Sequence, residues 1–385
     1  MLRWTPLLLL LVLSACAVAP SQPSAHPYFA DELFDPPSAP IDPAAVFAVS
    51  DEMQRYLDTE VVNQMGAKGR QRALAQALGD DADLRLDYDS TYTRNAAEAF
   101  AARSGNCLSL VIMTAALARQ MGIDVSFHRV HDDEFWSRDG DMYFSVGHVN
   151  VTLGGKPPAL GTRIDDGDQI TIDFLPVLDI REYKWKLVKE HTIVAMYLNN
   201  RAAESLAAGR LNDAYWFARA AILADPNFAT LFNTMGVVYL RRGAPDRAEQ
   251  VLVHGLHGDP GSTTLMSNLS AAYVRQGRLD EARKLDALIA RADPDPPFAF
   301  FNRGLLAMKA GDYRTARDLF AAEVKRAPHY DEFHFWLGLA LANLGETELA
   351  KAQLALAIAN STTRKDHDLY AGKLALIDSA KSMPR

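Results

Sequence analysis

Small residues and prolines recur at one fixed interval through the second half of the chain. Five glycines stand 34 residues apart, at Gly209, Gly243, Gly277, Gly311 and Gly345. Alanine keeps the same interval from Ala214 to Ala350, and proline keeps it from Pro226 to Pro328. Because three kinds of residue share one period, the pattern predicts a repeat architecture in which each unit buries its apolar face against its neighbours.

The period and its small residues resemble the tetratricopeptide repeat. The second unit matches the family's places best, with Phe232, Met235, Gly236, Tyr239, Gly243, Ala248, Leu252 and Pro260. The resemblance implies an all-α solenoid of five repeats over residues 193–362, with a C-terminal capping helix and tail over residues 363–385. Within each unit, glycine allows the turn between two helices and proline ends the second helix.

Polar side chains also recur within the repeats, near the sixth and thirteenth places of each unit. These residues are Asn200, Asn233, Asn268, Asn302, Arg241, Arg275 and Lys309. Asparagine can bond both the N–H and the C=O of an extended peptide, and a basic row can hold carboxylates. The rows resemble those of peptide-binding tetratricopeptide proteins and imply a protein or peptide partner in the groove. The alternative is that these residues are solvated groove walls.

The first sixteen residues have the layout of a secretory signal. Arg3 precedes an aliphatic run, Leu7–Leu13, which is too short to span a bilayer, and Leu-Ser-Ala-Cys follows and ends at Cys16. This ending resembles a bacterial lipobox, which implies a signal peptide over residues 1–15 and acyl chains of the palmitate kind on Cys16. Ala17 then implies an outer-membrane lipoprotein facing the periplasm of a Gram-negative cell. The alternative is an ordinary signal with an incidental cysteine.

Residues 16–45 follow the signal and show no apolar period. Seven prolines fall between residues 17 and 43, among alanines and serines. Proline-rich segments of this kind are extended. We therefore expect residues 16–45 to tether the lipidated cysteine to the folded body.

An uncharged apolar segment in the middle third predicts a buried helix. No charged residue occurs from Asn106 to Ala118, and Asn106 is a good N-cap. Cys107 then lies in the first turn, where the partial positive charge of the helix start favours the thiolate. It is one of only two cysteines in the chain, the other being Cys16. A cysteine that merely packs in the core is the alternative.

Two later segments, residues 147–153 and 169–174, alternate in polarity as strands do. His148 and Asp173 lie on the face of each strand opposite the apolar residues. Paired as a hairpin, the two side chains could meet. His148 would then take the proton of Cys107, and Asp173 would fix the imidazole tautomer.

The motifs Gly-Asn-Cys, Gly-His-Val and Ile-Asp-Phe, in this order, resemble the transglutaminase-like superfamily. The resemblance implies an α+β, papain-like domain over residues 46–190, with Cys107 as nucleophile, His148 as base and Asp173 as its orienter. The function it implies is a membrane-anchored cysteine acyl-transfer enzyme, either a peptidase or amidase or an amide cross-linker. The alternative is a non-catalytic repeat scaffold whose papain-like module has degenerated into a binding module.

Charge and composition reduce the number of classes of partner that the chain could bind. The net charge is −8 and no basic block occurs, which argues against a nucleic-acid partner. The residues show no pattern typical of a cofactor or metal site, so we predict neither. The remaining partners are a protein or peptide in the repeat groove and a membrane reached through lipid on Cys16.

Overall fold

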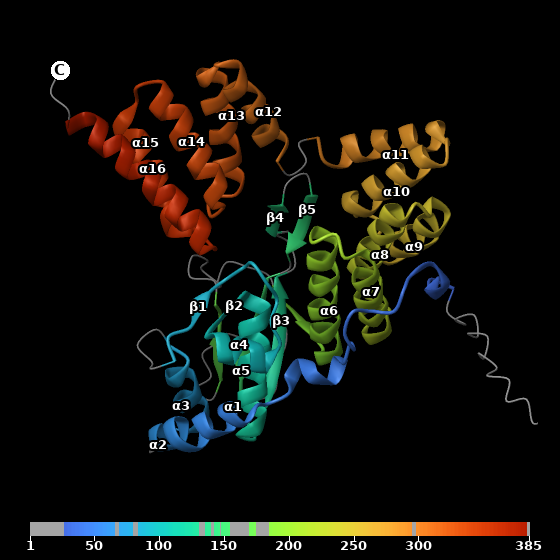
Figure 1. Ribbon diagram of the computed structural model, residues 1–385, viewed down its shortest axis with the longest axis vertical. Helices are drawn as coiled ribbons and strands as arrows, with labels where there is room; N and C mark the ends of the chain where they lie inside the picture. The colour runs from blue at the N-terminus through green and yellow to red at the C-terminus, as the bar shows by residue number, and fades with distance from the viewer. Residues whose placement is uncertain are drawn as a thin grey trace, which may run out of the picture.

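The computed structural model describes most of the chain (Figure 1). The described residues are 27–65, 69–79, 84–130, 135–139, 142–146, 148–154, 169–174, 185–294 and 298–382. The signal peptide and Cys16 lie outside them. Among the described residues, no helix is both long enough and apolar enough to cross a membrane.

The N-terminal domain packs helices on one antiparallel sheet. Its helical segments are α1 (Asp51–Tyr56), the π turn η3 (Leu57–Val61), α2 (Val62–Met65), α3 (Arg70–Ala77), α4 (Ala96–Ala102) and α5 (Cys107–Gln120). Its four-stranded sheet has the order β7-β6-β3-β8, with β7 (Ile170–Ile172), β6 (Val149–Leu153), β3 (Val125–Val130) and β8 (Trp185–Val188). The prediction of a buried helix is confirmed, because every residue of α5 from Cys107 to Ala118 is buried.

Two smaller strand pairs complete this domain. β1 (Asp87–Tyr88) runs parallel to β2 (Ser104–Gly105), and β4 (Phe135–Asp139) forms an antiparallel hairpin with β5 (Met142–Val146). β2 ends two residues before α5 begins, and β1 pairs with it from an earlier part of the chain. This pairing therefore holds the segment around Asp87–Tyr88 beside the start of that helix.

The predicted repeats are paired helices. They are α6 (Glu190–Ala207) with α7 (Leu211–Ala224), α8 (Thr230–Arg242) with α9 (Pro245–Gly258), α10 (Thr263–Arg275) with α11 (Leu279–Ala292), α12 (Ala299–Ala310) with α13 (Tyr313–Arg326), and α14 (Asp331–Asn343) with α15 (Thr347–Asn360). The capping helix is α16 (Arg364–Ser382). The five periodic glycines, which separate the two helices of each pair, all have φ between +72° and +80°. This left-handed conformation favours glycine, so the turn explains why the residue recurs.

A second glycine position lets the two helices of a repeat approach closely. A Cβ on Gly236 would lie 2.5 Å from Leu252, and one on Gly304 would lie 2.5 Å from Phe320. Ser270 has the equivalent place in the third repeat, where its hydroxyl donates to Asp286 at 2.7 Å. The third repeat thus replaces an apolar contact with a polar one.

Replacing Gly304 by alanine should lower the free energy of unfolding by about 1–3 kcal/mol, because the new methyl group overpacks against the buried ring of Phe320. Gly372→Ala is the matched control. Gly372 lies exposed on α16 with no atom near its missing Cβ, so alanine there should stabilise the helix by about 0.5–1 kcal/mol. Urea unfolding followed by circular dichroism measures both. Equal effects at the two positions would contradict the close approach.

The two domains share one apolar core. A continuous cluster of buried side chains runs from Phe29 through α5 and α6 as far as Ala272 in α10, and a separate cluster begins at Phe298, just before α12. The expected boundary near residues 190–193 therefore divides the helices from the sheet but does not divide the core. Figure 1 shows α12 to α16 as a second group of helices, apart from α6 to α11. This group meets the N-terminal domain where Ser90 N donates to Thr362 O at 3.3 Å.

Residues 27–47 differ from the extended tether that we expected for residues 16–45. They form a packed segment, called the strap below, with short 3-10 turns at Asp31–Leu33 and Pro43–Phe47. The ring of Phe34 stacks on Tyr215 of α7 at a centroid distance of 3.9 Å. The tether expectation is wrong for this part of the segment, because the aromatic residues between the prolines bury themselves against the repeats.

Candidate functional site

Asn106 caps the helix that presents Cys107. Its side-chain Oδ1 accepts hydrogen bonds from Ser109 N and from Ser109 Oγ, both at 2.9 Å. This is the N-cap that the sequence predicts. Cys107 is therefore the first residue of α5, with only 3% of its surface exposed.

The sheet brings His148 and Asp173 together. Val151 of β6 pairs with Ile172 of β7, so His148 just before β6 lies diagonally across from Asp173 just after β7. His148 Nε2–H donates to Asp173 Oδ2 at 2.8 Å, and the two side chains are 1% and 8% exposed. The predicted proximity is thus observed, while a catalytic role for the two residues is a proposal.

The side chain of Cys107 lies close enough to act on the imidazole of His148. Burial opposes a charge on the ring, but the hydrogen bond to Asp173 and the nearby Cys107 sulfur outweigh it and raise the pKa of His148 to about 9. The imidazole is therefore protonated at neutral pH and places a positive charge beside the sulfur.

Tyr88 also lies at the site, although it was not predicted from the sequence. It lies on β1 opposite Gly105, close enough for the backbone N–H and the side chain of Cys107 to act on its hydroxyl. Burial and the negative charge of the Cys107 sulfur raise the pKa of Tyr88, so its hydroxyl stays protonated. A strand of two residues has no periodicity, so no pattern in the sequence could have singled out Tyr88.

The contribution of His148 to stability should depend on pH. Its pKa is about 9 in the folded chain and 6.5 ordinarily, so the stabilisation is complete below about pH 6.5 and is lost as pH rises through 9. The loss should reach about 3 kcal/mol. Unfolding free energies of the wild type and His148→Gln, compared at pH 6 and pH 10, measure it. A difference between the two proteins that stays constant over this range would contradict the raised pKa.

The predicted groove residues differ from one another in exposure and in their contacts. Asn200 donates to Thr93 Oγ1 of the N-terminal domain at 3.2 Å, and Asn268 donates to Asn233 Oδ1 at 2.7 Å. Arg275 donates to the carbonyl of Leu240 at the end of α8. Arg241, Asn302 and Lys309 are exposed. The N-terminal domain therefore covers Asn200, and Asn233, Asn268 and Arg275 bond within the solenoid, so a groove role for these four residues stays a prediction.

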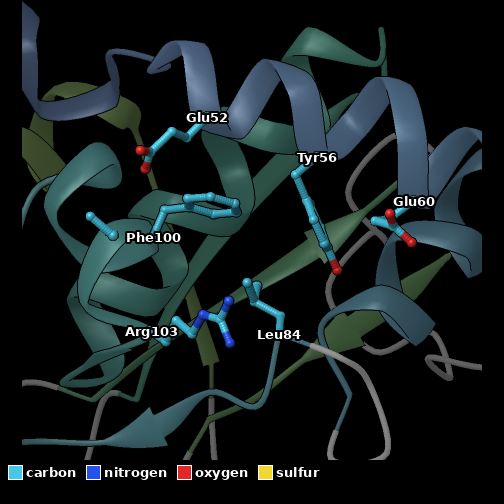
Figure 2. Close-up of a pocket in the computed structure, with 7 residues that line it drawn as sticks. Glu52, Tyr56, Glu60, Leu84, Phe100 and Arg103 are labelled. Carbon is cyan, nitrogen blue, oxygen red and sulfur yellow. The ribbon is translucent and has the colours of Figure 1, made fainter.

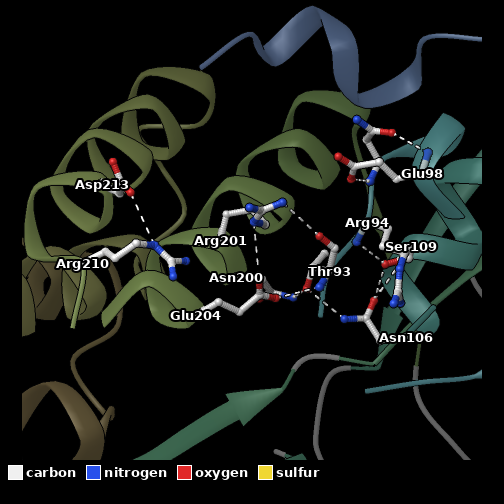
Figure 3. A network of polar contacts seen from close by, with 11 residues as sticks. Thr93, Arg94, Glu98, Asn106, Ser109, Asn200, Arg201, Glu204, Arg210 and Asp213 are labelled. Carbon is white, nitrogen blue, oxygen red and sulfur yellow. Dashed lines mark hydrogen bonds and ion pairs between the residues drawn. The ribbon is translucent and has the colours of Figure 1, made fainter. Parts of the chain in front are cut away.

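Thr93 joins the first repeat to the helix of Cys107 (Figure 3). Its hydroxyl accepts from Asn106 Nδ2 at 2.9 Å, on one side, and from Asn200 on the other. Its backbone N–H donates to Glu204 Oε1 of α6 at 2.7 Å. The solenoid is thus attached directly to the residue that caps α5.

A surface pocket lies on the other side of α4 (Figure 2). Its lining residues are Glu52, Tyr56, Glu60, Leu84, Phe100, Ala101 and Arg103. None of the three predicted catalytic residues lines it. Over the described part of the chain, no cluster of three or more His, Cys, Asp or Glu side chains could hold a metal ion.

Comparisons with known proteins identify the repeats. Models of the tetratricopeptide repeat match residues 239–299 and 301–364, and no curated protein matches the chain. Among solved structures, MamA is 19% identical, with 44% of this chain and 92% of MamA covered at a TM-score of 0.25. YrrB, described as a TPR protein with an unusual peptide-binding site, is 21% identical, with 46% and 92% covered at 0.25. Pseudomonas aeruginosa pilF is 19% identical, with 50% and 88% covered at 0.29.

At these identities and TM-scores, the solved structures carry no argument about function. None of the comparisons identifies the N-terminal α+β domain as papain-like. The two family matches together reach from the end of α8 to the first residue of α16. The C-terminal half of this protein is an all-helical tetratricopeptide-repeat solenoid.

Proposed function

We propose that the protein is a repeat scaffold that binds a peptide or protein partner. Tetratricopeptide solenoids present extended concave surfaces for this purpose, and the family models match the repeats of this chain alone. Asn302 and Lys309 of α12 are exposed and supply an amide and a positive charge to such a surface. This function has broader support than catalysis, because it needs only the repeats.

The scaffold function can be tested by selecting, from a random library, peptides that bind the immobilised full-length protein. Asn302→Ala and Lys309→Ala should each weaken the selected peptides about tenfold, since each removes one polar anchor. Arg314→Ala on α13, another exposed basic residue, is the control and should change little. Failure of the library to yield any specific peptide, or equal losses in all three variants, would count against binding at α12.

Acyl transfer by Cys107 is the second candidate, favoured by the 2.8 Å hydrogen bond between His148 and Asp173 next to the thiol. The sulfur would attack an amide carbonyl, and the C–N bond would break as the C–S bond forms. His148 would donate its proton to the departing amine. Water or a second amine would then attack the thioester and restore the thiol, and Asp173 would orient the ring throughout.

An activated ester serves as a substrate-independent probe of this chemistry. Mass spectrometry of the intact protein should show one acyl group, located on Cys107 by peptide mapping and absent in Cys107→Ala. The acyl group should disappear faster when a primary amine is added. A protein that is never acylated, although folded, would leave the non-catalytic scaffold as the function.

We also propose that Cys16 carries lipid and holds the protein at the outer membrane. The support is the lipobox-like sequence Leu-Ser-Ala-Cys that ends at Cys16. In a Gram-negative host, Cys16→Ser should move the protein from the membrane fraction to the soluble periplasmic fraction. A variant that stays with the membrane would contradict the anchor.

A further inference from the structure

The aromatic side chains of the strap are buried between the helices of the first two repeats. Phe29 is 4% exposed and Phe34 is 6% exposed. Phe34 stacks on Tyr215, and Tyr28 meets the edge of Phe232 at a centroid distance of 5.3 Å. Each buried aromatic ring of this size contributes about 1.5–3 kcal/mol, so these contacts anchor the segment.

Opposite charges line the two sides of this contact. Asp31 of the strap accepts from Arg219 Nε at 2.9 Å, and Glu32 lies 3.8 Å from a guanidinium nitrogen of Arg247. The guanidinium of Arg219 also lies over the ring of Phe29, 4.8 Å from its centroid. The solenoid therefore offers basic groups where the strap carries carboxylates.

Side chains of the repeats also bond the backbone of the strap. Tyr215 Oη accepts from Ala30 N at 3.0 Å, and Tyr239 Oη donates to the carbonyl of Tyr28 at 2.7 Å. Trp216 Nε1 donates to the carbonyl of Asp35 at 2.7 Å. Backbone groups satisfied by side chains of another element, together with pockets for alternate side chains, are how peptide-binding proteins hold a ligand.

We infer that the first two repeats carry a recognition surface for extended acidic peptides with spaced aromatic residues, and that the strap is its resident ligand. A peptide that fits places aromatic rings two residues before and three residues after an aspartate, as Phe29, Asp31 and Phe34 do. This surface is separate from the groove proposed above, because the contacts come from α7 to α9 and not from Asn302 or Lys309. A partner with this chemistry binds by displacing the strap.

A partner must compete with the tethered strap for this surface, and this competition sets the affinity that the partner needs. The anchored residues of the strap, Tyr28 to Ser38, are joined to its second turn, Pro43–Phe47, through residues 39–42, three of which are exposed. A ligand tethered by a short linker has an effective concentration in the millimolar range. The surface is therefore closed to weak ligands in the intact chain and opens when the strap is released.

The test begins with the folded full-length protein, with a protease recognition sequence inserted between Ala39 and Pro40. After cleavage, a fluorescent peptide of residues 27–39 should replace the cut strap, with a Kd in the micromolar range. The intact chain should bind the same peptide at least a hundredfold more weakly. Peptides with Phe34→Ala or Asp31→Ala should bind the cut protein at least tenfold more weakly than the natural peptide, and Arg219→Ala in the protein should reproduce the loss caused by Asp31→Ala.

Three results would overturn the inference. One is a cut strap that stays bound in gel filtration and does not exchange against excess labelled peptide, which would make it a permanent part of the fold. Another is a loss of helical circular dichroism when the strap leaves, which would have the same meaning. Equal binding by all three peptides would show association without recognition. Since none of these experiments involves α12, the groove proposal stands or falls separately.

Discussion

Alkylation of Cys107 by iodoacetamide at pH 7 should slow at least several-fold in His148→Ala. The thiolate is the reactive form of a cysteine, and a positive charge beside the sulfur favours it. The protonated imidazole of His148, whose pKa is raised to about 9, lies beside the sulfur and stabilises the thiolate through its positive charge. The variant removes this charge. Stopped-time alkylation followed by mass spectrometry gives the rate for each protein.

Two variants calibrate this result. Asp173→Asn should slow alkylation less than His148→Ala does. The imidazole remains in this variant, but it loses the carboxylate that orients the ring and raises its pKa. His257→Ala removes an exposed histidine of α9 and should leave the rate unchanged. If the native thiol reacts only after denaturation, and His148→Ala changes nothing, Cys107 is a packing residue and the scaffold is the whole function.

The parts of the site that could be read from the sequence are those written in continuous motifs. Asn106 and Cys107 open an uncharged helix, and a helix start needs an N-cap wherever it is buried. His148 and Asp173 flank strands whose alternation fixes the register, so their meeting followed from the pairing. The repeats could be predicted for a similar reason, since glycine recurs wherever the turn between the two helices requires a positive φ.

What the sequence did not reveal depends on contacts between distant segments. The strap has the prolines of a tether, and only the positions of Tyr215 and Tyr239, about two hundred residues later, show where its aromatic rings are buried. Asn200 has the spacing of a groove residue, but the N-terminal domain reaches it through Thr93. Such contacts are set by how the domains dock, which local periodicity does not encode.

The strap also changes the geometry that a lipid on Cys16 would impose. Free chain was expected up to residue 45, but the packed segment begins at Pro27. The eleven residues from Cys16 to Pro27 can span at most about 40 Å. Under the lipid-anchor proposal, the first two repeats are therefore held close to the bilayer, and the strap surface lies on the membrane-proximal part of the molecule.

Tyr88→Phe should separate two reactions of the same thiol. The hydroxyl of Tyr88 lies close to the backbone N–H of Cys107, which is the donor that an oxyanion formed at Cys107 would use. In acylation by an activated ester, Tyr88 would turn its O–H toward that developing oxyanion. Removing one oxyanion donor costs about a hundredfold or more in rate, so acylation of Tyr88→Phe should slow by about this factor.

Alkylation by iodoacetamide forms no oxyanion, so its rate in Tyr88→Phe should change only a few-fold. Tyr92→Phe is the matched control: Tyr92 packs against Arg201, 4.0 Å from the ring centroid, and both of its rates should match the wild type. Equal losses in both reactions would show that Tyr88 acts only on the thiolate, and no loss in either would make it a packing residue. Only the selective loss in acylation makes Tyr88 the side chain that completes an oxyanion site with the N–H of Cys107, because a packing defect would not distinguish between the two reagents.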